Sequence, residues 1–219
     1  MIDMLSKDDL APIKQYIVDN FLIPPGIVRI GGIPSSGKTT LARLLTDRMP
    51  GFGCVSSNMA RFLLQRGGLS CGENVHQVVM EMLDMCVPCW NGVIIDGMFG
   101  AEKERDLISA FAARNNFPVF TVFVAIDPSL AMQRARAKYP DHVVSTFRHW
   151  RPNNVKGYFE NIPRLHTKLA AYLEGHQGEV DAMSSNNSDR RELEHQAHRI
   201  VHHLREEFNL YYARHSLPR

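Results

Sequence analysis

The segment GGIPSSGKTT, at residues 31–40, restricts the fold of this chain more than any other stretch. It contains the pattern G-x-x-x-x-G-K-[ST], which forms a phosphate-binding loop when a strand precedes it and a helix follows it. Here the apolar run GIVRI comes directly before it, at 26–30, and the helical pattern KTTLARLLTDRM starts within it, at 38–49. The sequence therefore predicts a strand, a loop and a helix that hold a phosphate group, and not an ordinary glycine-rich turn.

The loop residues indicate which phosphate is held. In such loops, successive backbone N–H groups converge on a phosphate at the positive end of the helix. Lys38 would reach the β and γ phosphates, and the Thr39 hydroxyl would bind Mg²⁺. We therefore expect the loop to hold a nucleoside triphosphate. The residues expected around it are Gly32, Ile33, Pro34, Ser35, Ser36, Gly37, Lys38, Thr39 and Thr40.

Apolar runs alternate with helical patterns along the chain, which is typical of parallel βαβ units. The expected strands lie at 26–30, 52–56, 92–96, 119–127 and 178–184. Apolar residues at intervals of three and four predict the helices between and after these strands. They lie at 38–49, 58–68, 73–86, 101–116, 129–139 and 188–212. The expected fold is the three-layer α/β fold of P-loop NTPases, a five-stranded parallel sheet with helices on both faces.

We expect residues 1–219 to form a single domain, because this length suits one α/β unit. No internal repeat, low-complexity tract or Pro- or Gly-rich linker divides the sequence. An amphipathic segment within 1–24 predicts a helical extension before the first strand. Residues 139–157 interrupt the helical pattern and form a candidate lid or acceptor loop.

Composition excludes several classes of protein. The hydrophobic fraction of 44% argues against a disordered or fibrous chain. A net charge of +2, from 25 basic and 23 acidic residues, is too balanced to argue for nucleic-acid binding by bulk electrostatics. No apolar run approaches the roughly 20 residues that span a bilayer, and acids stand where a signal peptide carries bases. We expect a cytoplasmic protein without a membrane partner, and four irregularly spaced cysteines do not suggest a disulfide scaffold.

Asp96 is the expected second ligand of the metal. It ends the apolar run GVIID at 92–96, and ligands of open α/β sheets bind at this end of the strands. Phosphate-loop proteins hold Mg²⁺ with the loop Ser or Thr and with such a carboxylate. We therefore expect Thr39 and Asp96 to bind Mg²⁺. The alternative is that Asp96 caps the following helix.

Four segments together resemble the P-loop kinases of the polynucleotide-kinase and zeta-toxin group. They are GIPSSGKTTLA, VSSNMAR, GVIIDGMF and VFVAIDPSLAMQRARAK. The resemblance spans most of residues 26–140 and is weaker beyond them. It implies a nucleoside-kinase-like form of the fold, ATP as the phosphate donor, Mg²⁺ as the cofactor, and an alcohol or a phosphate as the acceptor.

The resemblance also assigns roles to the helix after the fourth strand. In that group two cations spaced i and i+4 close over the triphosphate, and here they fall on Arg134 and Lys138. Phosphoryl transfer develops negative charge on the equatorial oxygens, so a cation placed there has a chemical purpose. The expected catalytic set is then Lys38, Asp96 and Arg134. The alternative for Arg134 and Lys138 is an ordinary solvated basic face.

The acceptor position departs from the group's pattern. The group carries Asp, then Arg three residues later, after the second strand, and the Asp acts as general base. This chain has Asn58 and Arg61 at those positions. An amide cannot take a proton at pH 7, although it can orient a hydroxyl or bind a phosphate oxygen. Three alternatives follow: another carboxylate such as Asp96 is the base, the acceptor is an ionised phosphate that needs none, or ATP is hydrolysed without a small acceptor.

Three further features are weighed against plainer explanations. In the stretch 139–154, Trp150 could stack a base while neighbouring arginines bind phosphate, or it could simply lie in the core. Cys86 and Cys89 lack the second cysteine pair of a zinc site. His198 and His202 are spaced i, i+4, but they lack the carboxylate of a HEXXH arrangement and suggest a solvated helix face.

The sequence thus favours an Mg²⁺-dependent kinase that moves the γ-phosphate of ATP to a small-molecule, nucleotide or polynucleotide acceptor. Nucleic acid is a possible acceptor but is not required. The alternative from another class is an ATPase or nucleotide-driven switch that acts on a protein partner. A nucleotide-binding protein without catalysis is a third hypothesis, which the presence of Lys38, Thr39 and Asp96 disfavours.

Overall fold

The computed structural model describes residues 23–71, 74–97, 102–138, 155–175, 178, 180–186 and 190–215. The helix expected before the first strand lies outside the described residues, and so do residues 139–154 of the candidate lid, including Trp150. Residues 155–157 of that candidate lid lie in the first turn of a helix.

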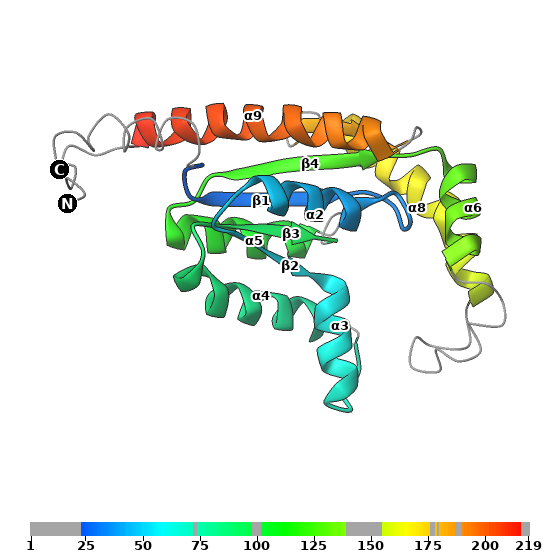
Figure 1. The fold of residues 1–219 in the computed structure, drawn as a ribbon. Helices are drawn as coiled ribbons and strands as arrows, with labels where there is room; N and C mark the ends of the chain where they lie inside the picture. The colour runs from blue at the N-terminus through cyan, green and yellow to red at the C-terminus, as the bar shows by residue number, and fades with distance from the viewer. Residues whose placement is uncertain are drawn as a thin grey trace, which may run out of the picture.

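The centre of the molecule is a five-stranded sheet in which every neighbouring pair is parallel (Figure 1). The strands are β1 (Gly26–Gly31), β2 (Phe52–Ser56), β3 (Gly92–Asp96), β4 (Val119–Ala125) and β5 (Ala182–Ser185). Their order is β2-β3-β1-β4-β5. This arrangement confirms the five-stranded parallel sheet expected from the sequence.

Helices cover both faces of this sheet. They are α2 (Lys38–Arg48), α3 (Ser57–Arg66), α4 (Asn74–Cys86), α5 (Glu102–Asn115), α6 (Pro128–Lys138), α8 (Val155–Gly175) and α9 (Arg190–His215), with a short 3-10 helix, η1, at Val87–Cys89. Helices α2 and α9 lie on one face, and α4 and α5 lie on the other (Figure 1). Among the described residues, no helix is both long enough and apolar enough to span a membrane.

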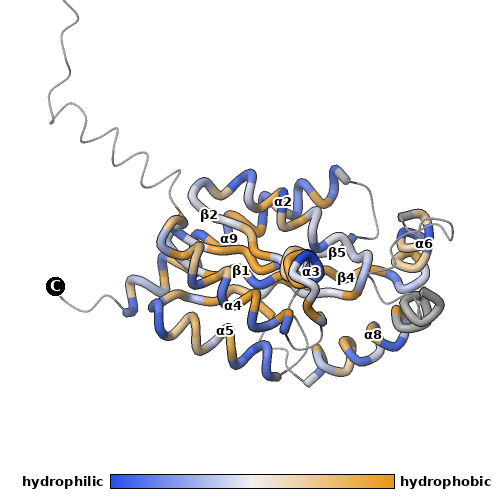
Figure 2. Tube along the Cα trace, turned by 90° about the horizontal axis from the view of Figure 1, so that it is seen from below, coloured by the Kyte–Doolittle hydropathy of each residue, from blue (hydrophilic) through white to orange (hydrophobic). Residues whose placement is uncertain are grey.

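The strands are mostly apolar on both sides because both faces of the sheet are covered, with Arg29 of β1 donating to Thr121 of β4 as a buried polar pair. In β1, Val28 and Ile30 pack with α2 and α9, while Ile27 packs with α4 and α5. Phe208 of α9 lies so close to the first strand that a Cβ on Gly26 would come within 2.4 Å of its ring. The hydropathy colouring shows the same arrangement, with apolar strands inside and polar helix surfaces outside (Figure 2).

A third apolar cluster joins the loop after β1 to α6 and α8. It consists of the buried residues Ile33, Ile126, Ala131, Ala135 and Ile162, with Leu169 packed against them. Ile33 belongs to the loop after β1, so this cluster fixes α6 beside that loop. Helices α6 and α3 both lie at the carboxyl end of the strands (Figure 1).

The structure corrects the sequence-based assignment in three places. Strand β5 is Ala182–Ser185 and not 178–184, because its pairing with β4 begins at Ala182 opposite Val122. Strand β4 ends at Ala125, two residues before the expected end, and Asp127 instead starts α6. Helix α8 was not predicted, because Pro163 lies inside it and a proline normally interrupts a helical pattern.

Candidate active site

The loop between β1 and α2 has the backbone geometry of a phosphate cradle. Gly32 and Gly37 have φ angles of 145° and 98°, and Ser35 has a φ of 61°. At Gly32 a side chain is also excluded by space, since a Cβ would lie 2.6 Å from the carbonyl oxygen of Val124. Gly37 precedes α2 and offers no side-chain cap, so the first N–H groups of this helix point into the loop without a capping side chain.

Lys38 lies against this loop. Its Nζ donates a hydrogen bond to the carbonyl oxygen of Ile33 at 2.7 Å. The Ser36 N–H donates to the same carbonyl at 3.2 Å, which closes the turn. The ammonium therefore lies over the loop, where a β or γ phosphate of a bound nucleotide would also lie.

Thr39 and Asp96 are in direct contact. The Thr39 hydroxyl donates to Oδ2 of Asp96 at 2.7 Å, across 57 residues of sequence. Asp96 is only 3% exposed and lies between Ile30 of β1 and Ser56 of β2 in the strand register. Asp96 is the last residue of β3, and the described part of α5 begins at Glu102.

The contact between Thr39 and Asp96 fits a magnesium ion. A hydroxyl and a carboxylate supply the hard oxygen ligands that Mg²⁺ prefers, and Mg²⁺ is usually held by one or two carboxylates together with substrate phosphates. Both side chains lie beside the loop that has the geometry of a phosphate cradle. Ser36 also lies in that loop, fully buried, and its hydroxyl has no hydrogen-bond partner among the described residues.

Asn58 and Arg61 lie on the first turns of α3. Strand β2 passes into α3 without a loop, and the Ser56 hydroxyl caps the helix by accepting a bond from the Met59 N–H at 3.1 Å. The Arg61 guanidinium donates to Oδ1 of Asn58 at 3.1 Å. The bond leaves the amide NH₂ of Asn58, a donor group, directed away from the arginine.

Ser57 adds a further polar group at this position. It is 2% exposed, and its hydroxyl has no hydrogen-bond partner among the described residues. A Cβ on Gly97, the residue after Asp96, would lie 3.5 Å from this hydroxyl oxygen. The start of α3 and the end of β3 are therefore neighbours.

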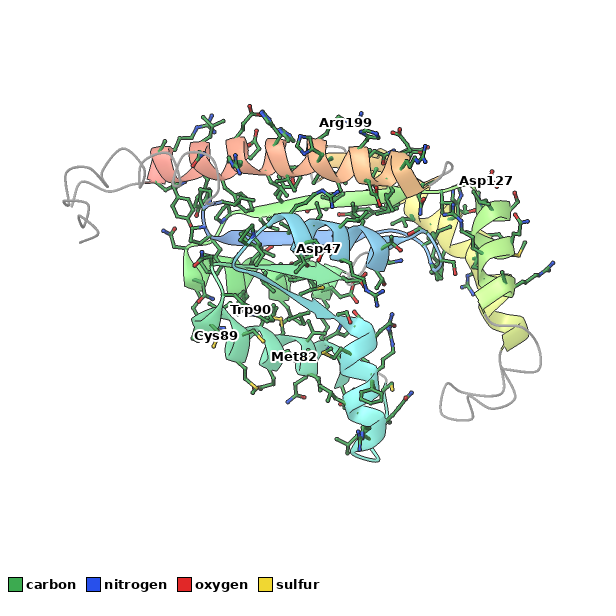
Figure 3. All side chains as sticks on the ribbon, in the orientation of Figure 1. Asp47, Met82, Cys89, Trp90, Asp127 and Arg199 are labelled. Atoms are coloured by element: carbon green, nitrogen blue, oxygen red, sulfur yellow. The ribbon has the colours of Figure 1, made fainter. Side chains whose placement is uncertain are left out.

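Arg134 lies on α6 between the buried residues Ala131 and Ala135, and it is partly exposed. Asp127, at the junction of β4 and α6, caps the helix by accepting bonds from the N–H groups of Ser129 and Leu130 and from the Ser129 hydroxyl (Figure 3). These bonds, that of the hydroxyl first, lower the pKa of Asp127. The Lys138 side chain lies outside the described part of the chain. The structure thus brings α6 to the loop, and the roles of both cations stay predictions.

One contact of the loop was missed from the sequence. Asn186, directly after β5, donates from Nδ2 to the carbonyl oxygen of Ser36 at 2.6 Å and is 7% exposed. No local motif marks this residue, and only the pairing of β5 with β4 brings it to the loop. Helix α8 did carry a signal, since Ile162 and Leu169 are spaced by seven residues and pack on the same apolar cluster as Ile33.

The other polar motifs do not join this site. Cys89 lies with Trp90 near the amino end of β3, the end of the sheet opposite the loop (Figure 3). His198 and His202 are exposed on α9. Within the described ranges, no three His, Cys, Asp or Glu side chains come together in a way that could hold a metal ion.

The strand order, the loop geometry and the contact of Thr39 with Asp96 define a P-loop NTPase fold. The model of the family AAA_33, an AAA domain, matches residues 27–151, and the chain belongs to this family. No curated protein matches the chain with significance. The matched residues include the loop, Asp96 and α6.

Solved structures share the fold at low sequence identity. A gluconokinase from Sinorhizobium meliloti 1021 has a TM-score of 0.55 and 16% identity, and the match covers 89% of this chain and 99% of that chain. The Mycobacterium tuberculosis APS kinase CysC, solved with AMPPNP and APS, has a TM-score of 0.52 and 15% identity, with 83% and 98% covered. A tunicamycin resistance protein from Deinococcus radiodurans has a TM-score of 0.55 and 16% identity, with 81% and 95% covered.

Proposed function

We propose that this protein is an Mg²⁺-dependent kinase that transfers the γ-phosphate of ATP to a small acceptor. The observation that carries the proposal is the bond of 2.7 Å between the Thr39 hydroxyl and the Asp96 carboxylate, directly beside the phosphate cradle. It supports a metal site at the place where the end phosphates of a nucleotide would lie. Two structural neighbours are named as kinases of small molecules, gluconokinase and APS kinase, and the second was solved with a nucleotide analogue.

In the proposed reaction the loop and Lys38 hold the triphosphate. The N–H groups at the start of α2 and the Lys38 ammonium bind the β and γ phosphates, with the ammonium leaving the Ile33 carbonyl to do so. Thr39 and Asp96 hold Mg²⁺, which neutralises charge on these phosphates when bound. Arg134, on a helix fixed beside the loop, adds positive charge as the γ-phosphoryl group moves. Little covalent chemistry remains for the protein, because phosphoryl transfer depends mainly on position and charge.

We propose that the acceptor is anionic and binds at the start of α3. The Arg61 guanidinium donates to Oδ1 of Asn58, and both the guanidinium and the Asn58 NH₂ group have N–H groups to offer a ligand. This combination binds a phosphate or carboxylate better than it removes a proton. The Ser57 hydroxyl, which has no hydrogen-bond partner in the described part of the chain, is a further polar group at this position. An ionised phosphate acceptor would need no general base, which agrees with an amide at position 58.

We further propose that the chain belongs with the polynucleotide-kinase and zeta-toxin group, on the strength of its four matching segments.

The test is transfer of labelled γ-phosphate from ATP to a panel of hydroxy acids, sugars, nucleotides and oligonucleotides, with Mg²⁺ and with EDTA. A kinase releases ADP in proportion to the phosphorylated acceptor, and only with Mg²⁺. Steady ADP release without any acceptor would instead support the ATPase or switch. Binding of ATP with neither transfer nor hydrolysis would contradict both.

A further inference from the structure

Asn186 ties the far side of the sheet to the phosphate loop. Its Nδ2 donates to the Ser36 carbonyl at 2.6 Å, and its own N–H donates to the carbonyl of Ala125, at the end of β4, at 2.9 Å. The atom that faces Ser36 must be the amide nitrogen, because a carbonyl oxygen can only accept. Backbone and side chain of Asn186 are therefore both fixed, and the residue is 7% exposed.

This contact sets the direction of one peptide group in the loop. In a trans peptide the C=O and the N–H point to opposite sides. With the Ser36 carbonyl turned toward Asn186, the N–H of Gly37 points the other way, toward the concave side of the loop. That N–H is one of the donors that a phosphate loop presents to its ligand. We propose that Asn186 is a positioning residue that orients the Ser36–Gly37 peptide for phosphate binding, an inference that rests on the proposed function.

The space around Gly37 supports the same assignment. A Cβ on Gly37 would lie 2.1 Å from Nδ2 of Asn186, so the amide occupies the space that any larger residue would need. The φ of 98° at Gly37 disfavours such a residue independently. The loop is thus packed directly against the Asn186 amide, which leaves no room for a side chain at position 37.

A second polar contact holds the end of β5. Gln196 of α9 accepts a bond from the Ser184 hydroxyl at 2.6 Å and donates to the carbonyl of Ser185 at 2.9 Å. Ser185 is the residue before Asn186, so its fixed carbonyl restrains the peptide that carries Asn186. Ser184 is fully buried and Gln196 nearly so, at 8% exposed.

The experiment measures the affinity of the purified protein for Mg²⁺-AMPPNP and for inorganic tripolyphosphate by calorimetry. Asn186→Leu removes the donor without adding charge, and Asn186→Asp replaces the donor with an acceptor. Each should weaken binding of both ligands by at least about tenfold, roughly the value of one buried hydrogen bond. Asn115→Asp is the matched control, because the Asn115 amide also donates to a backbone carbonyl, that of Phe111 at 2.8 Å, at the opposite end of the sheet.

The pH dependence of Asn186→Asp separates positioning from general stability. When the introduced carboxyl is protonated it regains a donor for the Ser36 carbonyl. The loss of affinity relative to the unsubstituted protein should therefore shrink as the pH is lowered toward the pKa of the carboxyl. A residue that matters only for folding would lower the unfolding temperature without such a recovery of phosphate affinity.

The outcomes are distinguishable. Affinities of Asn186→Leu and Asn186→Asp within about twofold of the unsubstituted protein, the range of an inert surface change, would overturn the inference and leave the proposed function standing. Failure of the unsubstituted protein to bind either ligand would overturn the proposed function and the inference with it. If Asn186→Asp does not fold, Asn186→Leu and Asn186→Ala decide by the same affinity criterion.

Discussion

The two sides of the proposed reaction are built differently in this molecule. The donor side is built on the loop backbone, with Ser36 at 0% and Asp96 at 3% exposed behind it, and of its two proposed metal ligands only Thr39 is exposed. Val124 of β4 and Asn186, directly after β5, pack against the loop. The acceptor side consists of side chains on the surface of α3. There Asn58 is exposed, and Phe62 one turn further is 55% exposed.

This difference indicates where specificity resides. A loop of backbone N–H groups binds any triphosphate in the same way, so the donor side needs a fixed shape. A helix surface can change its side chains without disturbing the sheet, so the acceptor side can vary. We expect substitutions on the donor side to abolish activity, and substitutions on α3 to change affinity for the acceptor.

The largest effect is expected for Lys38→Ala. Removal of the cation beside the transferred phosphoryl group should lower the transfer rate by about 10²- to 10³-fold. Losses of this size are typical when one group that stabilises charge in the transition state is removed. Lys168→Ala, an exposed lysine of α8, is the control and should be inert. The rate of phosphate transfer is the measurement, and a rate equal to that of the control would contradict the assignment of the loop.

Asp96→Asn should lower the rate of phosphate transfer by about 10²-fold at fixed Mg²⁺ concentration. It removes the negative charge of the carboxylate that pairs with Thr39 and keeps a side chain of the same shape. Nucleotide affinity measured in EDTA should change far less than affinity measured with Mg²⁺. Asp47→Asn is the control, since Asp47 is exposed on α2 (Figure 3). Equal losses with and without Mg²⁺ would show that Asp96 has a structural role.

On the acceptor side, Arg61→Gln should raise KM for an anionic acceptor by about tenfold, because it removes a charge-assisted hydrogen bond. Arg66→Gln is the control one turn further along α3, where the guanidinium lies 5.8 Å from the ring centre of Phe62. Affinity for ATP should be the same in both variants. A loss of ATP affinity in Arg61→Gln alone would place Arg61 on the donor side.

Asn58→Asp reports the charge of the acceptor. For an anionic acceptor the new carboxylate repels the substrate and raises KM by about tenfold, whereas for a neutral hydroxyl it can serve as a base and raise kcat. Steady-state kinetics with the acceptor found by the labelling screen distinguish these results. If neither constant changes, Asn58 is not in the acceptor site.

The smallest effect on activity is expected for Gln196→Met, behind the loop. The substitution leaves the Ser184 hydroxyl and the Ser185 carbonyl without their partner, which should lower the free energy of unfolding by about 1–3 kcal/mol and nucleotide affinity only a few-fold. Gln77→Met, exposed on α4, is the control. Urea unfolding and calorimetry are the measurements. An affinity loss as large as that of Asn186→Leu would mean that the two contacts act as one unit.

The same substitution has a pH signature. The Gln196 amide donates to Glu192 at 3.0 Å, and this bond, followed by the charge of Arg199, lowers the pKa of Glu192. A carboxylate with a lowered pKa in the folded state stabilises the fold above its unfolded pKa and loses this effect as the pH falls through the folded pKa. The stability difference between Gln196→Met and the unsubstituted protein should therefore narrow in acid, as measured by unfolding at a series of pH values.

The sequence predicted the elements around the loop well because their signals are local. Lys38, Thr39 and the loop glycines lie within eight residues, and the buried strands β2 and β3 have the predicted bounds. Asp96 follows from the end of such a strand. The roles of these residues remain predictions that the experiments above test.

The features that could not be predicted from the sequence depend on contacts between residues that are far apart along the chain. Asn186 meets Ser36 over 150 residues, and nothing in the stretch around it marks that contact. Strand β5 was predicted but with other bounds, because Ser184 and Ser185 have little apolar character and its extent is set by pairing with β4. Helix α8 was not predicted because Pro163 lies inside it, although Ile162 of this helix packs against buried residues of α6.

The packing of α9 on the first strand has a consequence for biosynthesis. One face of β1 and of α2 is covered by Leu193, Ile200 and Phe208, which a ribosome makes long after the loop itself. At 5–20 residues per second, Phe208 is added roughly 8 to 34 seconds after the loop has been synthesised. For that interval this face of β1 lacks the cover that α9 provides, and Asn186 is added only shortly before the interval ends. The proposed nucleotide site, although encoded early in the chain, is therefore among the last parts of the molecule to be completed.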